Sequence, residues 1–119
     1  MATNAAATIT SIELVEQFGN FKLVAFIEES DIDSSPEWNP AADEPPLSVA
    51  EAIRIAVRLG DDSVQAADVR EIDLRPVPNH DTHWHYLIMF ADEAKQSGYS
   101  FFVVLMNGKV VPAAIEPRV

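Results

Sequence analysis

Cysteine is absent from this chain, which excludes disulfide bonds, thiolate catalysis and cysteine-ligated zinc. Glycine is scarce as well: with four glycines in 119 residues, the glycine-rich loops that cradle nucleotide phosphates are not expected. No apolar run approaches the roughly 20 residues that cross a bilayer. Residues 1–10 also lack the basic start and the apolar segment of a signal peptide. These absences predict a cytoplasmic protein.

Basic residues are few: 8 Lys and Arg stand against 19 Asp and Glu, which gives a net charge of −11. Nucleic acids and anionic membranes are bound through clusters of Lys and Arg, so neither is an expected partner. Hydrophobic residues make up 48% of the chain, enough for the core of one domain spanning residues 1–119. Residues 1–8 are predicted to be a frayed end.

Acidic residues concentrate in one segment, residues 28–44, which has seven Asp and Glu and no Lys or Arg. Residues 30–46, which overlap this segment, carry four prolines and are predicted to form an acidic, proline-rich loop. A loop of that length is either functional or disordered in most compact domains. Trp38 lies at its centre.

Two interpretations of this segment remain open. The charge can simply keep a loop soluble, with the tryptophan folded back on the edge of the core. Alternatively, the loop is a docking surface for a basic protein, with the tryptophan as its anchor. The candidate partner-binding residues are Trp38, Asp31, Asp33, Glu37, Asp43 and Glu44.

The Gly-Asn pair at residues 19–20 separates two half-apolar runs and predicts an N-terminal β-hairpin, because glycine accepts the positive φ of a type II′ turn. Pairing Phe18 with Phe21 places the apolar side chains on one face, with Glu16 as the exception. A capping pattern in the same stretch also fits a helix followed by a strand. Whether residues 9–18 form strand or helix is therefore left open.

A helix is predicted after the acidic segment. Ser48 followed by Glu51 forms a capping box, and apolar residues then recur at helical spacing. Gly60 is expected to end the helix in the left-handed conformation that glycine adopts readily.

Four strands are predicted beyond the helix, at residues 69–75, 83–90, 99–106 and 109–115. The last two are joined at Asn107-Gly108, a strong hairpin signal because both residues accept positive φ. Pro112 cannot donate a ladder hydrogen bond, so the last strand should lie at a sheet edge or end early.

The strand predicted at residues 99–106 is apolar on both faces, as in a strand covered on both sides. The helix can cover one face. The other must be covered by the N-terminal hairpin or by a second subunit, and this surplus of apolar surface is the argument for a homodimer.

All three histidines lie within six residues. His83 and His85 should point to the same face of their strand, and with His80 they could bind a divalent metal such as zinc. The alternative is that His83 and His85 are ordinary surface residues beside a buried Trp84.

No other catalytic motif is present: the chain lacks a Gly-x-Ser-x-Gly elbow and a zincin motif. The adjacent acids Asp61-Asp62 and Asp92-Glu93 are predicted to face solvent. No catalytic residue is assigned.

These observations predict an α+β fold, with a single helix packed on an antiparallel four-stranded sheet and an N-terminal β-hairpin. The favoured function is a non-catalytic protein-binding module of the inhibitor, chaperone or immunity type, which uses the acidic loop and can form a homodimer. One alternative is a small metal-binding or metal-dependent protein that uses the histidine cluster. Another is a structural dimerisation domain.

Overall fold

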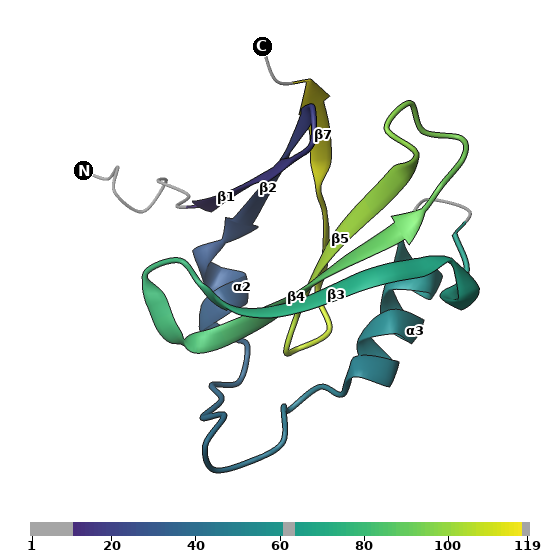
Figure 1. Cartoon of the computed structure of the whole chain (residues 1–119). Helices are drawn as coiled ribbons and strands as arrows, with labels where there is room; N and C mark the ends of the chain where they lie inside the picture. Colours follow the sequence, from purple (N-terminus) through teal and green to yellow (C-terminus); the bar gives the residue numbers. More distant parts are fainter. Residues whose placement is uncertain (1–10, 61–63, 118–119) are drawn as a thin grey trace, which may run out of the picture.

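The computed structural model describes residues 11–60 and 64–117, and it confirms the α+β class (Figure 1). Its strands form two antiparallel sheets. The predicted frayed end and the acids at 61–62 lie outside the described residues. Within the described ranges, no helix is long and apolar enough to cross a membrane.

The first sheet has the order β1-β2-β7 and consists of β1 (Ser11–Phe18), β2 (Phe21–Glu28) and β7 (Ala114–Pro117). The predicted hairpin is confirmed: Phe18 pairs with Phe21, and Gly19 takes a positive φ of 55°. The helix alternative is wrong over residues 11–18, because the alternating pattern turns every second side chain of β1 towards the core.

The second sheet has the order β3-β4-β5-β6 and consists of β3 (Val69–Val77), β4 (His80–Ala91), β5 (Tyr99–Leu105) and β6 (Val110–Pro112). A short 3₁₀ helix, η1 (Ala66–Asp68), leads into β3. The turn predicted between the last two strands of this sheet is present, and Gly108 supplies its positive φ of 88°.

The predicted strand at residues 109–115 is divided between the two sheets, which corrects the prediction of one continuous strand. β6 is an edge strand and ends at Pro112, as the missing N–H of proline predicts. The next residue, Ala113, donates its N–H to the carbonyl of Phe101 at 3.2 Å. The chain then leaves β5, and β7 pairs with β2 in the first sheet.

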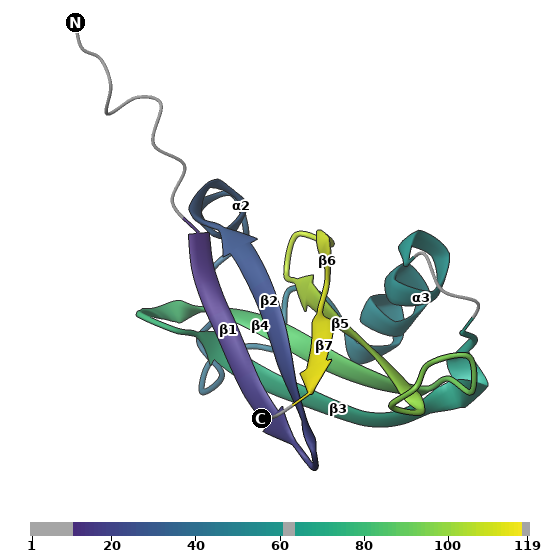
Figure 2. The ribbon, with the colours of Figure 1, turned by 90° about the horizontal axis from the view of Figure 1, so that it is seen from above.

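The core has two parts, one on each face of the second sheet. The first sheet covers one face, and α3 (Val49–Leu59) covers the other; Figure 2 shows the strands of the first sheet crossing those of the second. The N-terminal hairpin therefore covers the face of the second sheet that α3 leaves open. A second subunit was the alternative cover for that face. This removes the stated reason for a homodimer, which stays an untested prediction.

The start of α3 confirms half of the predicted capping box: Ser48 Oγ accepts the N–H of Glu51 at 3.1 Å. Gly60 ends the helix as its C-cap residue, which confirms that part of the prediction, but its φ of −69° is not the left-handed conformation that was expected. Glycine is needed there for space. A Cβ on Gly60 would lie 2.6 Å from the carbonyl oxygen of Ala56 and 2.8 Å from the ring of Phe102.

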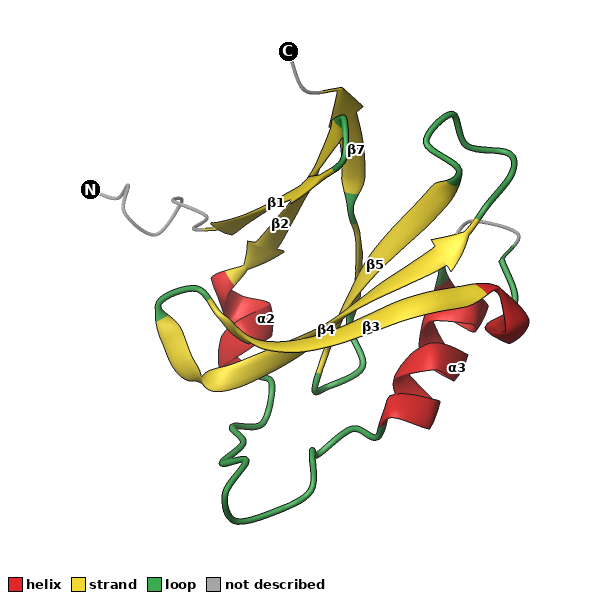
Figure 3. Cartoon of the chain, viewed as in Figure 1, coloured by secondary structure: helices red, strands yellow, loops and turns green. Residues whose placement is uncertain are grey.

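The predicted loop at residues 30–46 begins with a turn of helix. Its first residues belong to α2 (Glu29–Asp33), which follows β2 directly and lies apart from α3 (Figure 3). Ile32 explains this difference, because its fully buried side chain joins the core between the sheets.

Candidate functional site

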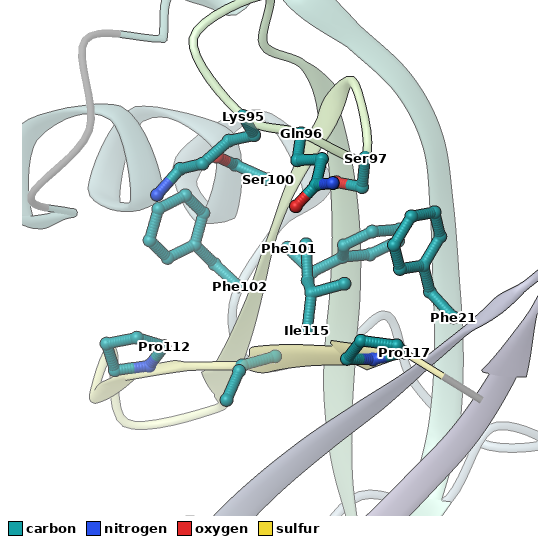
Figure 4. Close-up of a pocket in the computed structure, with 12 residues that line it drawn as sticks. Phe21, Lys95, Gln96, Ser97, Ser100, Phe101, Phe102, Pro112, Ile115 and Pro117 are labelled. Atoms are coloured by element: carbon teal, nitrogen blue, oxygen red, sulfur yellow. The ribbon is translucent and has the colours of Figure 1, made fainter. Parts of the chain in front are cut away.

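A pocket of about 320 Å³ opens where the β6–β7 segment leaves the second sheet (Figure 4). β5 pairs with β4 along its whole length, but β6 pairs only with residues 102–104. The start of β5 is therefore not covered by β6, and the chain passes away from it into the first sheet. The pocket lies between this segment and the turn at residues 92–98.

The lining combines an apolar floor with a polar rim. In Figure 4 the two sets face each other across the pocket. The apolar set is Phe21, Phe101, Phe102, Pro112, Ala113, Ala114, Ile115 and Pro117. The polar set is Lys95, Gln96, Ser97 and Ser100. Mixed lining of this kind is typical of ligand sites, in which apolar surface gives affinity and a few polar groups fix orientation.

The turn at residues 92–98 is hydrogen-bonded to a buried carboxylate. Asp92 is only 8% exposed; its Oδ2 accepts the hydroxyl of Ser100 at 2.6 Å and its Oδ1 accepts the N–H of Ala94 at 3.1 Å. Gly98 closes the turn with a φ of 85° and accepts the N–H of Asp92 at 2.8 Å. The prediction that Asp92 faces solvent is therefore wrong, whereas Glu93 is exposed.

The charge of the pocket differs from that of the whole protein. Of the described residues that line it, Lys95 alone is charged, although the chain carries a net charge of −11. Histidine is also missing from the described lining. The hydroxyl of Ser100 lies on a side chain that is only 2% exposed, so it is not presented to a substrate. The described lining therefore has no accessible nucleophile–base pair.

The acidic segment, residues 28–44, presents most of its predicted partner-binding carboxylates to solvent. The exposed members are Asp33, Glu37, Asp43 and Glu44. Asp31 is half-buried and forms an ion pair with Lys109 at 3.6 Å.

Trp38 is folded back onto the second sheet. Its ring packs edge-to-face on Trp84, with 5.0 Å between ring centroids. Its Nε1–H donates to the carbonyl of Asp43 at 2.9 Å, and its backbone N–H donates to the carbonyl of Thr82 at 2.9 Å. These contacts correspond to the interpretation in which the tryptophan covers the edge of the core.

The three histidines have different environments. His85 is fully buried, and neither of its ring nitrogens has a hydrogen-bond partner in the described part of the chain. Burial, reinforced by the guanidinium of Arg75, lowers the pKa of His85 to about 4. His80 and His83 are half-buried, with 6.3 Å between ring centroids. The described residues hold no cluster of three His, Asp or Glu side chains suited to a metal, so the metal-site hypothesis gains no support from them.

An ion cluster joins the two sheets at the edge away from the pocket. Arg75 Nη1 lies 2.6 Å from Glu16 Oε2, and its Nη2 lies 3.1 Å from Asp73 Oδ2. The hydrogen bond with Glu16 raises the pKa of Arg75. A hydrogen bond with Asp73 and the charge of that carboxylate raise the pKa of Glu71. This cluster explains why Glu16 occupies the otherwise apolar inner face of β1.

Comparison of the chain with protein-family models, with curated proteins and with solved structures finds no significant match. The functional argument therefore rests on the geometry of the pocket. Sequence reasoning missed this site because its walls come from β2, β5, the 92–98 turn and the β6–β7 segment, which are distant along the chain. The available signals were the early end of pairing at Pro112 and a basic residue, Lys95, in a predicted turn of an acidic chain.

Proposed function

We propose that this protein is a non-catalytic binding module that holds an apolar side chain of a partner protein in the pocket beside β5. The observation that supports this most is the pocket itself, which combines an apolar floor, a polar rim and a hydrogen-bonded turn. A site prepared in this way loses little conformational freedom on binding. The lack of an accessible nucleophile–base pair in its described lining favours binding over catalysis.

The form of the pocket favours a partner side chain over an added strand. β7 is the edge of its sheet, and edge strands can pair with an extended peptide. Pro112 and Pro117 have no N–H to donate, however, and proline is one of the devices that block such pairing. Contact through one inserted side chain avoids this difficulty.

The acidic segment adds an expectation about the partner. Its exposed carboxylates, on a chain of net charge −11, favour encounter with a basic protein. In this proposal the acidic segment attracts the partner, and the pocket provides the specific contact.

The test is to block the mouth of the pocket and compare captured partners. Gln96→Trp places a bulky ring on the rim, whereas Ala94→Trp places the same ring on an exposed position of the same turn outside the pocket lining. Tagged wild type and both variants are used to capture proteins from lysate, with quantitative mass spectrometry as the readout.

The proposal expects at least one protein that the wild type and Ala94→Trp retain and that Gln96→Trp loses. Binding of that protein is then measured by isothermal titration with the purified components. A set of captured proteins that is the same for all three baits, or the lack of any, would contradict the proposal. Circular dichroism of each variant checks that the fold is intact.

A further inference from the structure

We infer that the pocket recognises the C-terminal residue of a basic partner: an apolar side chain on the floor, with its terminal carboxylate at the rim beside Lys95 and Gln96. This inference rests on the proposed function and names the ligand of the same site. It is carried by the juxtaposition of a single cation with an aromatic floor in an otherwise acidic protein.

The rim has the donors that a carboxylate requires. Lys95 provides the only charge among the described lining residues. Its ammonium has three donors, so a ligand carboxylate can bind alongside the interaction that this residue already makes. Gln96 is exposed and contributes an amide with two further donors. The hydroxyl of Ser97, in contrast, is already bonded to the backbone of Tyr99.

The floor suits one apolar side chain. The rings of Phe101 and Phe102 are buried in the core beneath it and fix its shape before a ligand arrives. The apolar surface open to a ligand comes from the half-buried Phe21 and Ile115 and from the exposed Pro112 and Pro117. A volume of about 320 Å³ is at the lower end of the range for ligand pockets, about 300–1,000 Å³. A terminal residue brings both required groups, an apolar side chain and a carboxylate, into so small a space.

The charge of the whole protein indicates where the carboxylate comes from. A free organic anion would be repelled by the net charge of −11, and a phosphate dianion would be repelled more strongly. A carboxylate at the end of a basic chain avoids this penalty, because the basic residues of that chain are attracted by the net charge of −11. The source is therefore the C-terminus of a basic protein.

The test uses two short peptides that differ in one group. Acetyl-Lys-Lys-Gly-Phe with a free carboxylate is compared with the same peptide ending in an amide, by titration into ¹⁵N-labelled protein and measurement of two-dimensional amide spectra. The free acid should shift the signals of Gln96, Ser97 and Ala113 and should bind about tenfold more tightly than the amide.

Three lysine variants separate a specific contact from general attraction. Lys95→Gln should reduce the affinity for the acid to that for the amide, and Lys95→Arg should retain most of the preference because it keeps the charge. Lys109→Gln is the control: this lysine pairs with Asp31 and neither residue lines the pocket, so the preference for the acid should persist.

The outcomes distinguish this inference from the proposed function. Equal binding of acid and amide in the pocket would overturn the carboxylate inference and leave the pocket as a binding site. A lack of any shift at the pocket with either peptide would also overturn it, and the capture experiment with Gln96→Trp then decides the proposed function independently. An equal loss of preference in Lys109→Gln and Lys95→Gln would assign the effect to net charge and overturn the contact.

Discussion

The buried imidazole of His85 should make the fold sensitive to acid. This side chain is 0% exposed, and neither ring nitrogen has a hydrogen-bond partner among the described residues. A proton on the ring would bring a charge into the buried interior, near the guanidinium of Arg75. The folded state therefore keeps the imidazole neutral, with a pKa of about 4, against 6.5 for an exposed histidine.

The direction of the effect follows from proton linkage. Above pH 6.5 the imidazole is neutral in both the folded and the unfolded state, and the full stability is present. Between pH 6.5 and about 4 the unfolded chain takes up a proton that the folded state rejects, so the free energy of unfolding falls by about 1.4 kcal/mol per pH unit. The loss ends below pH 4 and amounts to roughly 3 kcal/mol in total, a large share of the stability of a small domain.

His85→Leu tests this reasoning. An apolar side chain removes both the proton-binding group and two unpartnered polar atoms, so the variant should be more stable than wild type at neutral pH by about 1–3 kcal/mol. The difference should widen by a further ~3 kcal/mol between pH 7 and pH 4. Urea denaturation at one-unit pH intervals gives both quantities, and carboxylates that titrate in the same range cancel in the comparison.

His83→Leu is the matched control, because this ring is half-exposed on the same strand and its replacement should leave the acid sensitivity unchanged. A difference between wild type and His85→Leu that is constant from pH 7 to pH 4 would refute the argument. It would mean that the imidazole is hydrated or partnered in solution.

Four further substitutions test other parts of the structure. Gly60→Ala should lower the free energy of unfolding by about 1–3 kcal/mol, because the added methyl group would overlap the ring of Phe102; an unchanged melting temperature would contradict the close approach. Asp92→Ala removes the hydrogen bond between the Asp92 carboxylate and the hydroxyl of Ser100, so it should lower the free energy of unfolding by about 1.5–3 kcal/mol and weaken peptide binding. Ser100→Ala should have a similar effect. Full stability of either variant would show that other contacts hold the turn. Trp38→Ala should cost about 2 kcal/mol of stability without affecting binding, whereas a loss of partner affinity at unchanged stability would make this side chain a partner anchor.

Features fixed by a few neighbouring residues could be predicted from the sequence. The N-terminal hairpin depends on the positive φ of Gly19, and the helix begins where the hydroxyl of Ser48 accepts a backbone N–H. The early end of β6 depends only on the missing N–H of Pro112. Each of these properties belongs to the residue itself, so distant parts of the chain are not needed to infer it.

The properties that depend on distant neighbours could not be predicted in this way. His85 and Asp92 are polar, and polar residues in short strands and turns usually face solvent. Whether they are buried depends on which elements pack over them. The first sheet packs on the face of β4 that includes Leu87, two residues after His85, and the hydroxyl of Ser100 donates a hydrogen bond to the carboxylate of Asp92. The apolar pattern of residues 109–115 likewise indicates a strand but not the sheet to which each part belongs.

The chain passes from the second sheet to the first at Ala113. This one change of sheet both closes the core between the sheets and forms the pocket. Because β6 pairs with β5 and β7 pairs with β2, this one segment joins the two sheets along one edge, as the Glu16–Arg75 ion pair does at the opposite edge. The same divergence leaves the start of β5 uncovered, and the pocket occupies that position. Its floor belongs to the core, so substitutions there would change folding and binding together. Its rim lies on an exposed turn, so substitutions at Lys95 and Gln96 can change binding while the fold is retained.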